Sequence, residues 1–186
     1  MAGALGASLV TMVASLSTGR PKYSAYADTL ARIDAAGREL ASEFLRLADQ
    51  DADAYAGYAA ALKLPRGTSD QQAARSAAIR TAAREASDAP WECVKACGVL
   101  VTAAEALAGR SNVNAASDVL VAAFLGEAAA RGAAENVRIN LPSTGDEEYN
   151  EAMSQRLDEA LHDISALAAR TREFVLSGRV REPEDE

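Results

Sequence analysis

Apolar residues recur at helical spacing along most of the chain. In the segment 23–62 they repeat along one helix face, at Leu30, Ile33, Leu40, Phe44, Leu45 and Leu47. Residues 4–16 form a shorter apolar segment, which ends at the sequence "STGRP". Spacings of three, four and seven residues are typical of helices whose one face is buried. The periodicity therefore predicts helices and gives no credible strand.

Turn residues divide the remaining chain into further helices. Pro65 and Gly67 break the helical pattern after the second helix. A new helix is also expected to begin at Ser87 or Asp88, because the Pro90 that follows is tolerated in the first turn of a helix. The sequence "GRSNVN" marks another turn. The pattern thus predicts about six helices, of which the first spans residues 4–16, the second 23–62 and the fifth runs from Asn114 to about Leu141.

Several helix ends carry recognisable capping residues. Ser69 with Gln72, and Thr144 with Glu147, have the spacing of a capping box, in which each side chain accepts a backbone hydrogen bond. Gly178 follows the last apolar repeat and suits the left-handed position after a helix. These capping signals indicate that the connections between the helices are short.

Composition narrows the fold class to all-α. Hydrophobic residues make up 49% of the chain but aromatic residues only 5%, so alanine and leucine supply most of the apolar surface. Alanine is the best helix former, whereas aromatic residues favour strands. We expect one helical bundle domain over residues 1–180, with long antiparallel helices. Residues 181–186, "REPEDE", form a charged tail.

Charge and cysteine content exclude several classes of function. The net charge of −8 argues against a nucleic-acid partner, which would require a basic surface. Cys93 and Cys97 lack a second ligand pair, so we expect buried reduced thiols in a cytoplasmic protein and no metal. His162 lies in a charged segment and is expected on the surface.

The first nineteen residues carry no charged side chain but do not resemble a targeting segment. They lack a basic start, and glycine, serine and threonine dilute their apolar character. They are also short and polar for a membrane span. A helix packed closely through small residues fits better, either at the bundle centre or in a homodimer interface.

Three polar clusters stand out. Residues 19–23, "GRPKY", bring two cations and a phenol to one turn, and residues 49–55, "DQDADAY", carry three aspartates. The third cluster consists of the two ends of the helix from Asn114 to Asn140. Each cluster also has a simpler interpretation, as a basic loop, a solvated acidic face or helix caps. Asn136 and Asn140 fit capping least well, because they lie at a helix C-terminus.

Helix geometry relates the residues of the third cluster. Asn114 with Asp118, and Asn136 with Asn140, lie on one stripe, because eighteen residues make a whole number of turns. Asp118 and Asn136 are nevertheless about 27 Å apart along the axis. One small pocket cannot use both ends unless an antiparallel helix or a symmetry-related subunit brings them together. Arg138 points away from this stripe, about 200° from Asn136.

Longer blocks of the sequence resemble a known family. The segments "GALGASLVTMVASLSTGRPKY", "DQDADAYAGYAAALKLP", "APWECV", "SNVNAASDVLVAAFLGEAAARGAAENVRINL" and "DEEY" follow one another as in the cyclodeaminase/cyclohydrolase family. This family comprises the cyclodeaminase domain of formiminotransferase-cyclodeaminase and bacterial methenyltetrahydrofolate cyclohydrolases. The resemblance runs from Gly3 to about Phe174.

The resemblance implies an all-helical, dimeric enzyme that acts on a tetrahydrofolate derivative. A cyclohydrolase opens 5,10-methenyltetrahydrofolate with water to 10-formyltetrahydrofolate, whereas a cyclodeaminase closes 5-formiminotetrahydrofolate and expels ammonia. Both reactions need proton transfer, with no cofactor beyond the folate substrate and no metal. No membrane or nucleic-acid partner is expected.

Candidate site residues follow from the matching segments and from residue chemistry. Asp51 or Asp118 could act as the general base, and Lys22 and Tyr23 could deliver a proton or orient the pterin. Arg138 or Lys22 could pair with the glutamate tail of the substrate. The remaining candidates could hydrogen-bond the pterin edge or fix the turn: Asn112, Asn114, Asn136 and Asn140.

One departure from the family pattern supports an alternative hypothesis. Family members usually carry a segment of the form proline–glycine–glycine–glycine–serine before the first helix, whereas this sequence starts with "MAGALGASLV". If that segment contacts the substrate, a non-catalytic helical dimer that binds a folate-like molecule becomes the alternative to the enzyme.

Overall fold

The computed structural model describes residues 1–183 and confirms the all-α fold class. Within these residues the chain forms five α-helices, and a short 3₁₀ turn lies in every connection except the one between the second and third helices. The α-helices are α1 (Ala2–Ser17), α2 (Ala27–Leu62), α3 (Ser69–Leu107), α4 (Ala116–Asn140) and α5 (Glu147–Ser177); the 3₁₀ turns are η1 (Pro21–Tyr26), η2 (Val113–Ala115) and η3 (Leu141–Thr144).

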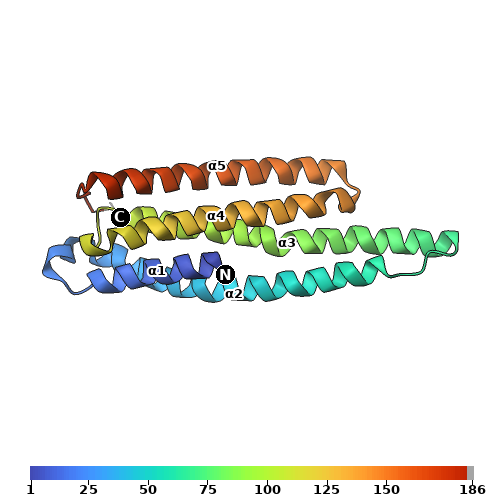
Figure 1. Cartoon of the computed structure of the whole chain (residues 1–186), viewed down its shortest axis with the longest axis horizontal. Helices are drawn as coiled ribbons and strands as arrows, with labels where there is room; N and C mark the ends of the chain where they lie inside the picture. Colours follow the sequence, from blue (N-terminus) through green and yellow to red (C-terminus); the bar gives the residue numbers. More distant parts are fainter. Residues whose placement is uncertain (184–186) are drawn as a thin grey trace.

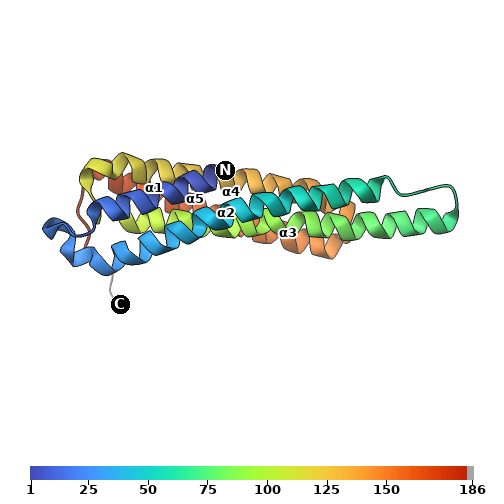
Figure 2. The same cartoon turned by 90° about the horizontal axis from the view of Figure 1, so that it is seen from below.

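The helices form an elongated bundle. In Figure 1, α2 and α3 make a long hairpin whose tip projects beyond the end of the α4–α5 pair. The short helix α1 covers only part of this length, and the N-terminus lies near the middle of the bundle in both Figure 1 and Figure 2. Beyond the start of α1, the faces of α2, α3 and α4 are therefore left partly open.

The expected helix start at residues 87–90 is wrong, because α3 runs without interruption through Pro90. A proline inside a helix lacks the N–H that would bond to the carbonyl four residues earlier, here that of Ala86. In this structure the side chain of Asn140, from α4, donates to that carbonyl at 2.9 Å. A contact from another helix thus replaces the missing bond, and this explains why five α-helices form instead of six.

The N-terminal caps of α3 and α5 lie one and two residues away from their expected positions, and only the cap of α3 is a capping box. The cap of α3 is Thr68, which accepts from the Gln71 backbone, and the Gln71 side chain accepts from the Thr68 backbone in return. The cap of α5 is Asp146, whose carboxylate accepts from the backbone of Tyr149 at 3.0 Å. Gly178 ends α5 in the left-handed region, with φ +62°, as predicted.

Small residues let α1 and α4 approach the centre of the bundle closely. A Cβ placed on Gly126 of α4 would lie 2.6 Å from Val101 of α3, and one on Gly6 of α1 would lie 2.8 Å from Leu100. Both distances are shorter than non-bonded carbon–carbon contacts, so a larger residue at either position would force the side chains of Val101 or Leu100 to shift. The buried side of α1 consists of Gly3, Gly6, Ala7, Val10, Val13, Ala14 and Ser17.

The segment Val113–Thr144, which contains α4, is long and apolar enough to cross a membrane by length and composition. In the bundle this helix packs against α1, α3 and α5, and Val119, Ala122, Ala130 and Val137 are buried.

The chain after α5 folds back across the end of the bundle. The Arg181 backbone donates to Gly109, and its carbonyl accepts the hydroxyl hydrogen of Tyr26. The Arg181 side chain reaches the buried carboxylate of Glu105 at 2.9 Å. The first residue of the expected tail is therefore docked, and residues 184–186 of that tail lie outside the described part of the structure.

Candidate functional site

A groove opens at the middle of the bundle, where α1 begins. Two adjoining cavities of about 310 and 230 Å³ share Asp51 and Asn136 in their walls. These volumes approach the size of typical small-molecule sites. We call this the central groove; its walls are formed by Met1, Ala2, Gly3, Phe44, Leu47, Ala48, Asp51, Ala52, Tyr55, Tyr58, Ala86, Ala89, Pro90, Cys93, Ala129, Gly132, Ala133, Asn136 and Asn140.

Asp51 and Asn136 face one another across this groove. Asp51 lies on α2 and Asn136 on α4, and the amide nitrogen of Asn136 donates to Asp51 Oδ1 at 3.2 Å. Both side chains are half-buried. The contact holds one carboxylate oxygen and leaves the other available to a ligand, which is the arrangement that a general base requires. The structure thus brings together two of the residues expected from sequence.

Asn140 lies one turn further along α4 and also lines the groove, but its amide hydrogen bond is used within the fold. It donates to the Ala86 carbonyl that Pro90 leaves without a helical partner. Asn140 therefore fixes the α3 wall of the groove. This contact was not expected when Asn140 was assigned to substrate binding.

Arg138 lies on the other side of α4, as the helix geometry predicted. Its guanidinium pairs with Glu135 and with Asp158 of α5, each at 2.6 Å. Arg138 consequently links α4 to α5 and does not line the central groove. The structure separates it from Asn136 and Asn140.

Cys93 contributes a thiol to the groove wall. It is half-buried, whereas Cys97, one turn later on α3, is fully buried; both are free thiols. A hydrogen bond from the Cys97 thiol lowers the pKa of Cys93. The pKa of Cys97 is raised, first by the same contact with Cys93 and then by burial.

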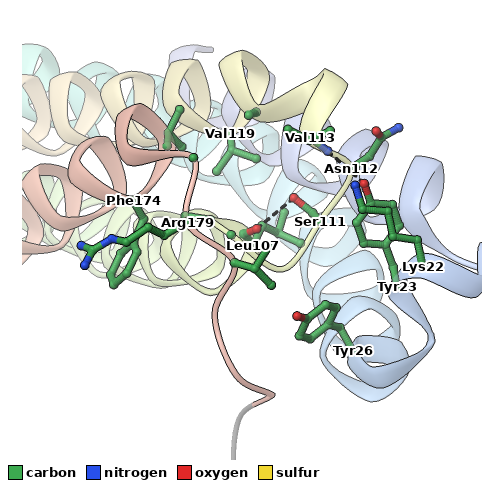
Figure 3. Close-up of a pocket in the computed structure, with 16 residues that line it drawn as sticks. Lys22, Tyr23, Tyr26, Leu107, Ser111, Asn112, Val113, Val119, Phe174 and Arg179 are labelled. Atoms are coloured by element: carbon green, nitrogen blue, oxygen red, sulfur yellow. Dashed lines mark hydrogen bonds between the residues drawn. The ribbon is translucent and has the colours of Figure 1, made fainter.

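A second cavity, of about 180 Å³, lies at the far end of the bundle (Figure 3). Lys22 and Tyr23 from η1 lie beside Asn112 and Val113 on one wall, and Phe174 lies on the opposite wall. The buried Tyr23 hydroxyl accepts the backbone hydrogen of Val113 at 3.2 Å. We call this cavity the end pocket.

Asn112 is buried and organises the turn beside this pocket. Its side chain accepts from the backbone of Asn114 at 3.1 Å, and its own backbone donates to Ser17 of α1 at 2.8 Å. Asn114 itself is exposed, and Asp118 is half-buried on the first turn of α4. These contacts join the end of α1 to the start of α4.

The candidate residues therefore divide into two groups. Asp51, Asn136 and Asn140 line the central groove, whereas Lys22, Tyr23, Asn112, Asn114 and Asp118 lie at the end of the bundle. Helix α4 is continuous from Ala116 to Asn140, so Asp118 and Asn136 are separated by the expected distance of about 27 Å along the helix axis.

The sequence interpretation missed some residues of the groove. Tyr55 and Tyr58 follow Asp51 on α2 by one and two turns, and Tyr58 shares a hydrogen bond with Ser143 at 2.9 Å. Their spacing of four and seven residues from Asp51 is a signal that could have identified them. Cys93 was taken as a buried thiol, and only the groove geometry shows that it is accessible. His162 is exposed, as expected.

No three His, Cys, Asp or Glu side chains within residues 1–183 are grouped closely enough to hold a metal ion. The groove itself presents a carboxylate, amides, phenols and a thiol among largely apolar walls.

Comparisons with known proteins agree on one family. The family model of formiminotransferase-cyclodeaminase matches residues 1–159. The chain is 32% identical over 177 residues to the methenyltetrahydrofolate cyclohydrolase of Methylorubrum extorquens, which covers 95% of this chain and 85% of the relative.

Two further relatives carry the cyclodeaminase name. The chain is 31% identical over 166 residues to the formimidoyltransferase-cyclodeaminase of Rattus norvegicus, covering 89% of this chain but only 31% of that longer protein. The crystal structure of formiminotetrahydrofolate cyclodeaminase from Thermotoga maritima superposes with a TM-score of 0.84 at 27% identity, over 95% of this chain and 84% of that one.

Proposed function

The chain belongs to the formiminotransferase-cyclodeaminase family, and we propose that this folate one-carbon enzyme works as a methenyltetrahydrofolate cyclohydrolase. In this reaction water adds to the methenyl carbon between N5 and N10 of the folate. The bond from that carbon to N5 then breaks, which gives 10-formyltetrahydrofolate and releases one proton. The cyclohydrolase of Methylorubrum extorquens, which aligns with nearly the whole chain, supports this choice of substrate.

The observation that carries the proposal is the Asp51–Asn136 pair in the central groove. Asn136 fixes Oδ1 of Asp51 and thereby directs the carboxylate into a cavity with largely apolar walls. The methenyl compound carries a positive charge spread over N5, the bridging carbon and N10. A carboxylate beside this cation lowers its free energy in the groove, because the apolar walls reduce solvent screening.

The same carboxylate can transfer the protons that the reaction requires. We assign Asp51 as the group that accepts a proton from the attacking water and returns it to N5 as the ring opens. Asn136 holds the carboxylate in the required orientation. Tyr55 and Tyr58, on the same face of α2, offer phenol groups that can contact the pterin.

Cyclodeamination is the second candidate, because the Thermotoga maritima cyclodeaminase shares the fold over most of both chains. In that reaction N10 attacks the formimino carbon, and the tetrahedral intermediate expels ammonia. With the formimino nitrogen entering protonated, Asp51 would accept the N10 proton and pass it to that nitrogen, which then leaves as ammonia. The two reactions therefore place the same demand on the groove.

We propose that the enzyme uses no small molecule other than its folate substrate and water. Proton transfer to and from water or ammonia requires no redox group, so the proposed chemistry uses the folate and the side chains of the groove alone. The free thiols Cys93 and Cys97 are consistent with a reducing compartment, and we propose a cytoplasmic location.

The test incubates the purified protein with methenyltetrahydrofolate and, separately, with formiminotetrahydrofolate, while the absorbance of the methenyl chromophore is followed. Enzyme-dependent loss of the chromophore is expected in the first reaction. Formation of the chromophore with release of ammonia, and no loss in the first reaction, would replace the cyclohydrolase by the cyclodeaminase. No change in either reaction would overturn both candidates and favour a binding protein.

A further inference from the structure

Two thiols lie one turn apart on α3, where this helix forms a wall of the central groove. Cys93 lines the groove together with Asp51 of α2. Cys97 follows four residues later, so the two side chains lie on the same face of the helix. Cys97 is 0% exposed, whereas Cys93 is half-buried, and both are free thiols. One thiol of the pair can therefore be reached from the groove, and the other lies behind it in the core.

The two thiols contact one another directly. Cys97 donates a hydrogen bond to Cys93, and this contact is the main reason that the pKa of Cys93 is lowered. Burial and the negative charge of Asp51 oppose this effect without reversing it. The same contact, with burial, raises the pKa of Cys97, which consequently keeps its proton. The thiolate is the nucleophilic form of cysteine, so Cys93 is the reactive member of the pair.

Neither metal binding nor the proposed reaction gives this pair a role. Within residues 1–183 no third His, Cys, Asp or Glu lies close enough to join the two thiols around a metal ion. A zinc site would need three or four protein ligands. Proton transfer in the proposed reaction is assigned to Asp51. The chemistry left to the pair is that of the thiols themselves.

The arrangement has the properties of a thiol pair that responds to oxidants. Redox-sensing cysteines have a lowered pKa, are accessible to small molecules and lie next to a second thiol that can form a disulfide. Cys93 meets the first two conditions, and Cys97 meets the third. In a reducing compartment disulfides are mostly transient and serve catalysis or redox sensing, so a reversible bond is expected here.

We propose that hydrogen peroxide converts Cys93 and Cys97 to a reversible disulfide, and that this bond closes the central groove to its ligand. The Cys93 thiolate attacks one peroxide oxygen; the S–O bond forms, the O–O bond breaks, and the leaving hydroxide takes up the proton that Cys93 released. The sulfur of Cys97 then attacks the sulfur of Cys93. The S–S bond forms as the S–O bond breaks, and the hydroxyl group leaves as water with the proton of Cys97. Two thiols are oxidised, and one peroxide is reduced to two water molecules.

Such a disulfide must change the shape of the groove wall. Residues four apart on a helix have Cβ atoms about 5–6 Å apart, whereas a disulfide requires about 3.5–4.5 Å. This turn of α3 must therefore contract by about 1–2 Å. It lies just after Pro90, where α3 lacks one backbone bond and depends on the contact from Asn140. The contraction displaces Pro90 and Cys93, which are both wall residues, relative to Asp51. Strain of this kind also makes a disulfide easy to reduce.

The first test follows the thiols and needs no folate. The purified protein is treated with hydrogen peroxide, and the remaining thiols are blocked with N-ethylmaleimide under denaturing conditions. The mass should fall by about two units, with no maleimide attached. Trypsin cleaves after Lys95, between the two cysteines, so peptides 85–95 and 96–110 should be joined after oxidation and separate after treatment with dithiothreitol. Maleimide on both cysteines, or a disulfide between two chains on a non-reducing gel, overturns the proposal.

Two matched variants assign the roles of the two thiols. In Cys97→Ala the reaction should stop at the sulfenic acid of Cys93, which dimedone traps as an adduct on peptide 85–95. In Cys93→Ala the buried, protonated Cys97 should stay reduced under the same treatment. Oxidation of Cys97 in that variant at the wild-type rate would contradict these roles. Conversion of wild-type Cys93 to a sulfinic acid, without linkage to Cys97, would do so as well.

The second test measures the effect on the groove after catalase has removed the peroxide. The kcat/KM for methenyltetrahydrofolate should fall by about tenfold or more, because a shift of about 1 Å is enough to misplace a bound substrate. Dithiothreitol should restore it. Cys93→Ala should have the same kcat/KM before and after peroxide; an equal loss in this variant would show that closure has another cause. This arm rests on the proposed function for the identity of the ligand.

A structural readout keeps the two proposals distinguishable. Trp91 is the one tryptophan of the chain and lies two residues before Cys93 on α3. Its fluorescence emission should shift on oxidation and return on reduction in the wild type, but not in Cys93→Ala. Linked peptides with unchanged emission and turnover would show that the groove stays open, which overturns the closure. A wild type that forms the disulfide and shifts its emission but never turns over folate refutes the proposed function alone.

Discussion

The proposed proton transfer depends on one residue, Asp51. The change Asp51→Asn keeps the size of the side chain and removes its ability to accept a proton. General acid–base catalysis contributes about 100-fold or more to a rate, so turnover of methenyltetrahydrofolate should fall by at least that factor. The initial rate at saturating substrate is the measurement.

A matched variant on the same helix controls for this change. Asp53 lies two residues after Asp51 on α2 and is exposed outside the groove walls. Asp53→Asn should leave kcat unchanged within a factor of about two, since substitutions of solvated surface residues have small effects. Equal losses in both variants would show that the acidity of this helix, and not the carboxylate in the groove, supports turnover.

Cys93 provides a probe of the groove at the residue scale. Its pKa is lowered by the hydrogen bond from Cys97, so its thiolate forms at lower pH than that of an ordinary cysteine. The rate of alkylation by iodoacetamide should therefore rise with pH below the usual thiol range. Cys97→Ala removes the donor and should move this rise to higher pH.

Substrate binding should protect the same thiol. Cys93 lines the central groove, and Cys97 lies behind it in the core. Bound tetrahydrofolate is expected to slow the alkylation of Cys93, as measured by mass spectrometry of the modified peptide. Unchanged labelling under saturating folate would place the ligand elsewhere, with the end pocket as the next candidate.

At the scale of the helix, α3 shows how a contact from another helix can override a local signal. Pro90 is a sound predictor of a helix boundary, and sequence periodicity alone favours a new helix there. What keeps α3 continuous is Asn140, which lies fifty residues later in the chain and donates to the Ala86 carbonyl. No local pattern contains this information.

This contact predicts a thermodynamic coupling between Asn140 and Pro90. Asn140→Ala leaves the buried Ala86 carbonyl without a donor and should reduce the free energy of unfolding by about 1–3 kcal/mol. In a Pro90→Ala background the new backbone N–H of residue 90 can bond to Ala86. The cost of Asn140→Ala should then shrink by about 1 kcal/mol or more, as measured by urea denaturation in a double-mutant cycle.

Asn136 is the appropriate reference for this cycle. It lies one turn before Asn140 on α4, but it bonds to Asp51 and not to α3. Asn136→Ala should cost the same free energy of unfolding in the wild-type and Pro90→Ala backgrounds. Additive behaviour of Asn140→Ala as well would refute the role given to its amide.

Across the helices, the sequence predicted those features that depend on the local pattern of residues. The helical class, the end of α5 at Gly178 and the opposite directions of Arg138 and Asn136 on α4 all follow from periodicity and turn chemistry. The caps of α3 and α5 were misplaced because serine, threonine and aspartate are all good capping residues and lie close together at both helix starts. Which of the polar residues share a pocket could not be predicted, since this depends on how α1, α2 and α4 pack.

The whole molecule is organised around the short length of α1. Because α1 covers only part of the α2–α3 hairpin, its start leaves the central groove open and its end supports the turn at Asn112. The same helix separates acidic residues near the groove from basic residues at the turn.

The end of the bundle is closed by a tether that the sequence did not predict. Glu105 is buried within α3, and its carboxylate pairs with Arg170 of α5 at 2.8 Å and with Arg181 at 2.9 Å. Arg181 also stacks over Phe174, 4.1 Å from the ring centroid. These contacts bind the chain after α5 to the core instead of leaving it as a free tail.

Loss of this tether should lower the stability of the whole bundle. Arg181→Ala removes a hydrogen bond to a buried carboxylate and should reduce the free energy of unfolding by about 2 kcal/mol. Arg179→Ala is the control, because its ion pair with Glu173 is exposed on both sides and such pairs contribute about 0–1 kcal/mol. Urea denaturation at low and high salt measures both. Since buried pairs are screened less than exposed ones, the effect of Arg181→Ala should persist in high salt. If the two variants lose equal stability, the C-terminal segment rests on the bundle without holding it together.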